Sequence, residues 1–246
     1  MSLQDHLEEL RHRLLIMVAA LLIAFIGSYF VARPVLHWML NTVGVHRVIV
    51  VGVTEAFFGI LKVAFMLALA ASSPVIFYQL AAFVTPGLLP HERRLVAVVA
   101  VPGLVLFVAG MAGGFFLIVP TVLRIMIGFT GNGIVERFTL SSVLSFIINL
   151  TLPFGVIAEL PLLGAVLARM GLLSPAWFAR QRRYAIFIAF AIASILAPPD
   201  ALSMILMAVP IYLVYELTAL VARLAWRARA RSTQDMDWPP RAGKMD

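Results

Sequence analysis

The chain has 246 residues, of which 62% are hydrophobic and only 13% are charged, whereas soluble domains are about 45–50% hydrophobic and about 25% charged. So few charges cannot cover the surface of a soluble domain of this length, and the hydrophobicity also excludes a disordered chain. The absence of cysteine excludes a disulfide scaffold, thiol catalysis and cysteine metal sites, so the composition predicts a membrane protein with several spans.

Six apolar stretches follow one another along the chain, most of them within the roughly 17–25 residues that a helix needs to cross a bilayer, or longer. A cleaved secretory signal is disfavoured for the first stretch because Asp5, Glu8 and Glu9 precede it and no A-x-A-like site follows. We predict an all-α protein with one transmembrane domain at residues 1–231 and a polar, flexible cytoplasmic tail at 232–246. The predicted spans are 14–31, 56–84, 95–119, 140–168, 184–197 and 201–221.

The last two stretches are short, and only a turn around Pro198-Pro199-Asp200 separates them. The fifth has about 14 residues, or roughly 21 Å of helix against a hydrocarbon core of roughly 30 Å. Glu216 interrupts the sixth. Two arrangements are open: two short spans that thin the bilayer locally, or a re-entrant hairpin. We favour two short spans.

Basic residues in the loops predict the orientation. Arginine and lysine gather before the first span, in every second loop and after the last span, so six spans with both termini in the cytoplasm fit. This distribution contains no basic groove with interleaved aromatic residues, and a nucleic-acid partner is not expected. The basic residues on the predicted cytoplasmic side are Arg11, Arg13, Arg93, Arg94, Arg169, Arg180, Arg182, Arg183, Arg223, Arg227, Arg229, Arg231, Arg241 and Lys244, and those on the opposite side are Arg33, Arg47, Arg124 and Arg137.

The two segments on the outer side, residues 32–55 and 120–139, are moderately apolar. We expect them to form short interfacial helices and turns. Five prolines inside the spans predict bent helices and a curved bundle with room for a groove. They are Pro74, Pro102, Pro153, Pro161 and Pro210.

The residues that an intramembrane enzyme needs are missing from the predicted spans. All five histidines lie outside them, and the sequence has no H-E-x-x-H motif, no G-x-S-x-G motif and no pair of intramembrane aspartates. We therefore expect no enzymatic activity, no metal site and no cofactor.

Three charged side chains do lie within the predicted spans, where burying a charge costs several kcal/mol. Lys62 lies near the outer interface and is expected to extend toward the head groups. Glu159 lies too deep for that, which favours a polar cavity or a functional contact over a locally hydrogen-bonded structural acid. Glu216 lies near the end of the sixth span, two turns before Arg223, which favours pairing or an interfacial position.

Two glutamates on the predicted cytoplasmic side are best explained as surface charges on composition alone. Glu9 is four residues from Arg13, a spacing that favours a helical salt bridge of a few tenths of a kcal/mol. Glu92 lies in TPGLLPHERR, which we expect to be a solvated loop.

A set of motifs across nearly the whole chain except the tail changes that interpretation. They are HLEELRHRLL at 6–15, TEAFFGILKV at 54–63, SSPVIFYQLAAFVTPGLLPHERR at 72–94, FVAGMAGGFFLIVP at 107–120, FGVIAELP at 154–161, MGLLSP at 170–175, RRYAIFIAF at 182–190, APPDALS at 197–203 and AVPIYLVYE at 208–216. Together, and in this order, they resemble a known family, the multi-spanning subunit of the twin-arginine protein translocase (TatC).

The resemblance implies a six-helix architecture with a concave wall in the bacterial inner membrane. It also implies recognition of signal peptides that carry paired arginines, and export of folded proteins driven by the proton-motive force. The implied partners are twin-arginine signal peptides, small single-span subunits of the TatA and TatB types, further copies of the chain, and the lipid bilayer.

The resemblance also assigns candidate residues. The family's signal-peptide site matches Glu9 and Glu92, with Arg11 nearby in the motif. A guanidinium binds a carboxylate bidentately, which an ammonium cannot do, so two carboxylates on adjacent segments suit two consecutive arginines better than two lysines. We hypothesise that Glu92 carries most of this contact and that Glu9 assists.

Further matches lie inside or beyond the membrane. Glu159 matches an acid that the family holds within its concave face, and Asp200 matches the acid between the last two spans, a candidate partner or gating contact.

Two hypotheses from other functional classes remain. One is a proton-coupled carrier that uses Lys62, Glu159 and Glu216 as relay groups, which the missing internal repeat opposes. The other is a structural membrane scaffold.

Overall fold

The computed structural model describes residues 3–45, 47–84, 90–128, 138–197 and 200–236. Within these ranges it describes the side chains of residues 7–45, 47–83, 101–128, 138–197 and 200–228. The described chain is almost entirely helical, as predicted. Its elements are α1 (Leu3–Val43), β1 (Val48–Ile49), α2 (Glu55–Val84), α3 (Pro90–Gly113), the π-helical segment η2 (Gly114–Ile118), α4 (Val119–Gly128), β2 (Phe138–Thr139), α5 (Leu140–Ile157), α6 (Leu160–Met170), α7 (Pro175–Leu196) and α8 (Ala201–Met236).

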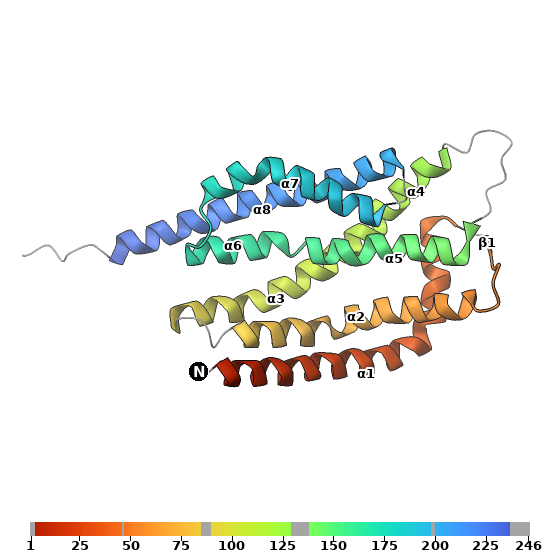
Figure 1. The fold of residues 1–246 in the computed structure, drawn as a ribbon, viewed down its shortest axis with the longest axis horizontal. Helices are drawn as coiled ribbons and strands as arrows, with labels where there is room; N and C mark the ends of the chain where they lie inside the picture. The colour runs from red at the N-terminus through yellow and green to blue at the C-terminus, as the bar shows by residue number, and fades with distance from the viewer. Residues whose placement is uncertain (1–2, 46, 85–89, 129–137, 198–199, 237–246) are drawn as a thin grey trace, which may run out of the picture.

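The helices run back and forth along one elongated bundle (Figure 1). One end, which we call the N-terminal end, holds the start of α1, the end of α2, the start of α3, the α6–α7 turn and the last turns of α8. The opposite end holds β1 and β2, which pair in parallel with Val48 opposite Phe138 and Ile49 opposite Thr139. Alternate connections therefore lie at the same end, as a chain that crosses a membrane repeatedly requires.

Five of the described helical segments are long and apolar enough to cross a membrane. They are Leu7–Val43, Glu55–Phe83, Val101–Gly128, Leu140–Met170 and Ala201–Ala228. Helix α7 is not among them, because its N-terminal half carries Arg180, Arg182 and Arg183. Its apolar remainder coincides with the short fifth stretch of the sequence, and the helix runs from the N-terminal end toward the other end of the bundle (Figure 1).

Several helices differ from the predicted elements. The helical stretch that begins with α3 continues through η2 and α4 to Gly128 rather than ending at residue 119, and α8 continues past residue 221 to Met236. Helix α1 continues to Val43 with Pro34 inside it, so residues 32–43 are not the separate short helix that we expected; the helix instead bends toward its C-terminal end (Figure 1). The stretch predicted as one helix at 140–168 is divided, since α5 ends at Ile157 and α6 begins at Leu160. Pro161 explains the break, because it lacks the N–H that would bond the carbonyl of Ile157.

Glycines allow α3 to pack closely against α5. A Cβ atom on Gly110 would lie 2.4 Å from the Cβ of Ala158 and 2.6 Å from the carbonyl oxygen of Phe154. From the opposite side, a Cβ on Gly155 would lie 2.7 Å from Cγ of Met111. Lipid is as apolar as leucine, so membrane helices associate through close packing of this kind rather than through the hydrophobic effect.

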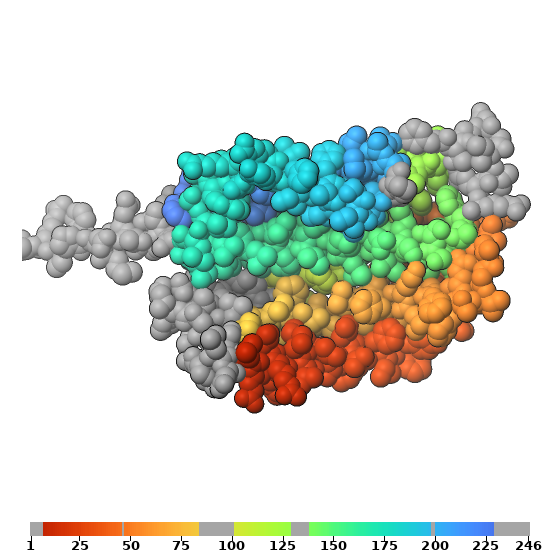
Figure 2. Space-filling view, viewed as in Figure 1, coloured from red at the N-terminus to blue at the C-terminus, as the bar shows by residue number. Residues whose placement is uncertain are grey.

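Helix α5 is the centre of the bundle. It contacts α2, α3, α4 and α8, and Leu144, Ile147 and Leu150 on it are fully buried. Helix α1 forms one long edge of the molecule and α7 lies along the opposite edge (Figure 2). The outward faces of these edge helices carry exposed Phe30 and Phe187. An apolar outer surface of this kind is one that a bilayer covers.

The close α3–α5 packing predicts that Gly110→Ala destabilises the protein. The added methyl group meets a backbone oxygen and a short side chain, which cannot move away easily, so we expect a loss of about 1–3 kcal/mol. The matched control is Gly113→Ala, since a Cβ there meets nothing within 4 Å and alanine favours a helix more than glycine does. Thermal unfolding in detergent should show a lower midpoint for Gly110→Ala only. Equal midpoints for the two variants would contradict the packing.

Candidate functional site

An ion pair near the start of α1 is tied to α2. Arg13 donates from Nη2 and Nε to Oε1 of Glu9, at 2.6 and 3.0 Å, and from Nη1 to Oε1 of Gln79 at 3.2 Å. The Glu9 and Arg13 side chains are only 19% and 21% exposed, and Gln79 is buried. The ion pair expected from the spacing is therefore present, but it is mostly buried, and Arg13 also hydrogen-bonds Gln79 on α2.

The second oxygen of the Glu9 carboxylate lacks a hydrogen-bond partner in the part of the chain that the structure describes. Both bonds from Arg13 end on Oε1, whereas Oε2 is buried and has no hydrogen-bond partner among the described residues. A buried charged acceptor without a partner costs free energy, and such atoms in native proteins call for an explanation. A donor supplied by a ligand would satisfy it.

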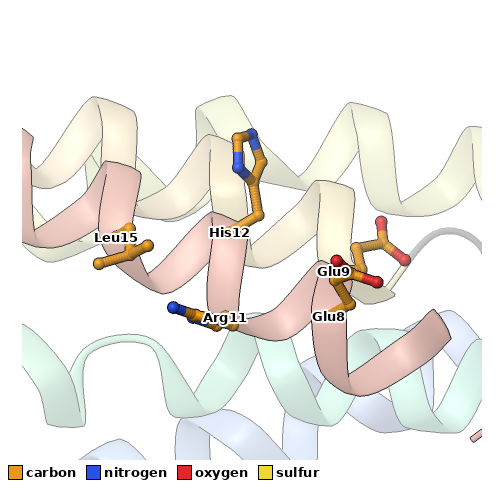
Figure 3. A pocket seen from close by; sticks show the side chains of 5 residues that line it. All are labelled: Glu8, Glu9, Arg11, His12 and Leu15. Atoms are coloured by element: carbon orange, nitrogen blue, oxygen red, sulfur yellow. The ribbon is translucent and has the colours of Figure 1, made fainter. Parts of the chain in front are cut away.

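An open cavity of about 550 Å³ adjoins this carboxylate (Figure 3). Among the described side chains it is lined by Glu8, Glu9, Arg11, His12 and Leu15. All five come from the first turns of α1, and Glu8, Arg11, His12 and Leu15 follow the spacing of one helix face. The cavity therefore offers two carboxylates and an exposed guanidinium at the N-terminal end of the bundle.

Glu92 lies in the first turn of α3 rather than in the loop that we expected, because α3 begins at Pro90. Proline is favoured at the first position of a helix, since its fixed φ suits the helix and its missing N–H is not needed there. This turn lies at the same end of the bundle as the start of α1 (Figure 1). The side chain of Glu92 lies outside the described residues. The structure thus places Glu9 and Arg11 at one cavity. For Glu92 it gives only the position of the backbone, which lies at the same end of the bundle.

Glu159 lies at the break between α5 and α6, where it precedes the first turn of α6. Its carboxylate faces α3: Oε2 lies 3.2 Å from where a Cβ of Gly103 would stand, and the backbone of Phe107 is within hydrogen-bonding reach. The other oxygen, Oε1, is buried and has no hydrogen-bond partner in the described part of the chain. A fully satisfied structural acid would not leave that atom unpaired.

Glu216 is held by two neighbours. Its Oε2 accepts a bond of 2.9 Å from Nη2 of Arg182 on α7, and its Oε1 accepts one of 2.6 Å from the hydroxyl of Tyr212. The expected pairing is present, but the partner in this ion pair is Arg182 rather than the Arg223 that the sequence suggested. The contact joins α7 to α8 and gives Glu216 a structural role.

Lys62 and Asp200 also make local contacts. Nζ of Lys62 on α2 donates to Oγ of Ser145 on α5 at 2.9 Å. Oδ1 of Asp200 accepts from the backbone N–H of Ser203 at 2.7 Å, the contact of a residue that caps the start of a helix. Asp200 also lines a cavity of about 430 Å³ with Met126 and the first residues of α8.

Among the described residues, these intramembrane charges are not joined into a relay. Lys62 and Glu216 have separate partners, Oε1 of Glu159 has none, and no hydrogen bond joins the three side chains. This arrangement counts against a proton-coupled carrier. The same described residues include no group of three or more histidines and acids placed to hold a metal ion.

Glu55 was not among the residues predicted from the sequence. Its Oε2 accepts from the backbone N–H groups of Val51 and Gly52, at 2.7 and 3.3 Å, and its Oε1 accepts from that of Ser141 at 2.7 Å. The carboxylate therefore joins the starts of α2 and α5. A signal was present, since an acid directly before an apolar helix suits its positive N-terminal end.

Comparisons with known proteins agree with one another. A family model described as "Sec-independent protein translocase protein (TatC)" matches residues 5–210. The Sec-independent protein translocase protein TatCy of Bacillus subtilis is 32% identical over 241 residues, which are 96% of this chain and 95% of that protein. The TatC protein of Carboxydothermus hydrogenoformans is 34% identical over 226 residues, 91% of this chain and 93% of that protein.

The fold is similar to that of a solved relative. A crystal structure described as the twin arginine translocase receptor TatC matches with a TM-score of 0.81 at 32% identity, covering 89% of this chain and 99% of that chain. Together with the apolar helices, these matches identify an integral membrane protein of protein transport. By sequence and by fold, the chain belongs to the TatC family of Sec-independent protein translocase proteins.

Proposed function

We propose that this protein is the receptor subunit of a twin-arginine translocase. It binds signal peptides with paired arginines at the N-terminal end of the bundle and takes part in exporting folded proteins with the proton-motive force. The observation that carries the proposal is Oε2 of Glu9, a buried acceptor with no partner among the described residues, on a side chain that lines a polar cavity. The relatives support it, because a solved structure with the same fold is described as a twin arginine translocase receptor.

The proposed contact follows from the shape of the guanidinium group. Its planar fork of N–H donors matches a carboxylate, whereas an ammonium is a point charge with no such plane. One peptide arginine pairs with Glu92 and the other with Oε2 of Glu9. Arg11 lines the same cavity, and its guanidinium suits a carbonyl or carboxylate of the bound peptide.

The proposed topology has six spans, with α7 as the short fifth span, a concave wall formed by bent helices, and both termini in the cytoplasm of a bacterial cell. Support comes from the segments that contain the basic residues predicted to face the cytoplasm, because these segments gather at one end of the bundle. The start of α1, the α6–α7 turn and the last turns of α8 all lie at the N-terminal end (Figure 1). The positive-inside rule then assigns this end to the cytoplasm and places the cavity where cargo arrives.

Partner subunits are proposed to contact the acids within the membrane. Single-span subunits of the TatA and TatB types, and further copies of the chain, complete the complex. Oε1 of Glu159 is a buried acceptor at membrane depth with no partner among the residues that the structure describes, so a polar group of a partner helix can bond it. Asp200 offers a second contact beside its cavity at the opposite end of α8.

Peptide binding tests the receptor proposal. Purified protein in detergent should bind a peptide with an Arg-Arg signal more tightly than its Lys-Lys variant. Glu92→Gln should weaken Arg-Arg binding at least about tenfold, the effect of losing one charged hydrogen bond, and Glu9→Gln should weaken it less. Titration of a fluorescent peptide measures both dissociation constants.

The matched control for these variants is Asp235→Asn, which removes a carboxylate from the last turns of α8. It should leave the affinity for the peptide unchanged, since the proposal gives that carboxylate no contact with the peptide. Equal affinity for the Arg-Arg and Lys-Lys peptides, or full binding by Glu92→Gln, would overturn the proposed receptor site.

Export in cells tests the role of Glu159. Glu159→Ala removes the unpaired acceptor and should lower the export of a folded reporter several-fold, whereas Glu159→Gln keeps a side-chain oxygen and should retain more activity. Val156→Ala is the control, because it trims an exposed apolar side chain on the same stretch of chain. Wild-type export by Glu159→Ala would rule out the contact.

A further inference from the structure

The guanidinium of Arg13 is held from two helices at once. Nε and Nη2 bond Glu9 on α1, and Nη1 bonds Gln79 on α2. Gln79 is 8% exposed and lies within a long helix, so it is a fixed point against which the arginine is placed. Three of the five N–H donors of this guanidinium are therefore engaged within the protein.

The two bonds to Glu9 have an unusual distribution. A guanidinium commonly pairs with both oxygens of a carboxylate through two parallel bonds. Here both bonds end on Oε1, and Oε2 is left buried without a partner among the described residues. The arginine thus fixes the orientation of the carboxylate through one oxygen and leaves the hydrogen-bonding capacity of the other unused within the described part of the chain.

We propose that Arg13, anchored by Gln79, is a positioning residue that orients the Glu9 carboxylate and reserves its Oε2 for an arginine of the signal peptide. This inference rests on the proposed receptor function and deepens it. The arginine acts through Glu9 and makes no contact with the peptide itself. Its benefit is that the peptide need not order a flexible glutamate when it binds.

A competing explanation is that Arg13 occupies the place of a peptide arginine and must leave before the peptide binds. The Gln79 bond argues against it, because this bond holds Arg13 in place independently of Glu9. The unpaired oxygen argues against it too, since a placeholder would use both carboxylate oxygens.

Simple electrostatics and the positioning role predict opposite changes in peptide affinity when Arg13 is removed, so one binding measurement distinguishes them. Arg13 is a positive charge beside a cavity that is proposed to take a positive peptide, so removing it should strengthen binding by Coulomb's law. If Arg13 instead positions Glu9, removing it should weaken binding.

The experiment titrates Arg-Arg and Lys-Lys peptides against the full-length protein in detergent. Arg13→Gln should weaken Arg-Arg binding by about two- to tenfold, the range expected when one flexible side chain must be ordered on binding. Lys-Lys binding should change less, so the preference for arginine falls. Arg13→Lys restores the charge but lacks the planar fork, and it should not restore the preference.

Two further variants separate positioning from a general loss of structure. Gln79→Leu leaves the Arg13–Glu9 pair but removes its anchor, and it should shift binding in the same direction by a smaller factor. In a Glu9→Gln background, Arg13→Gln should have no additional effect, because its only route to the peptide is through Glu9. The control Arg227→Gln removes an exposed positive charge from the C-terminal part of α8 and should leave both affinities unchanged.

The outcomes distinguish failure of the proposed receptor function from failure of the proposed positioning role of Arg13. If the wild-type protein shows no preference for Arg-Arg, the receptor proposal itself fails. If the wild type prefers Arg-Arg and Arg13→Gln binds it equally well or more tightly, only the positioning role is overturned. Full rescue by Arg13→Lys, or an undiminished Arg13→Gln effect in the Glu9→Gln background, would also overturn it.

Discussion

The cost of placing a charge in lipid governs this structure more than any other interaction. A chain with 13% charged residues can cross a bilayer only if the charges lie at the ends or find partners within the protein. Glu216 meets that demand with Arg182 and Tyr212, and Lys62 donates to Ser145. Against this background, Glu159 is an exception, because its buried Oε1 has no partner among the described residues. Glu9 lies at an end of the bundle, but its buried Oε2 likewise has no partner in the described part of the chain.

Backbone features determine where those two acids lie. Pro161 ends α5 and places Glu159 at a helix break, and Gly103 on α3 leaves space for its carboxylate. Gly110 and Gly155 hold α3 against α5 along the same seam. At the N-terminal end, the long continuous α1 presents Glu9 beside α2, where Gln79 can reach Arg13. Uncharged residues such as Pro161, Gly103 and Gln79 therefore determine where the carboxylates of Glu159 and Glu9 lie.

Local patterns predicted much of the structure, and long-range contacts explain most of what they did not predict. The i, i+4 spacing of Glu9 and Arg13 was enough to expect their ion pair. No local pattern points from Arg13 to Gln79, or from Glu216 to Arg182, because these pairs form only when separate helices pack. The length of α1 was underestimated, since Pro34 bends the helix without ending it.

The central claim is that the N-terminal end of the bundle receives the paired arginines of a signal peptide. The most direct test is photo-crosslinking from a group placed next to the arginine pair, followed by mass spectrometry of the crosslinked segments. The account predicts crosslinks to the first turns of α1 and the first turn of α3, lost when the arginines become lysines. Crosslinks concentrated near β1 and β2, or unchanged by the lysine substitution, would contradict it.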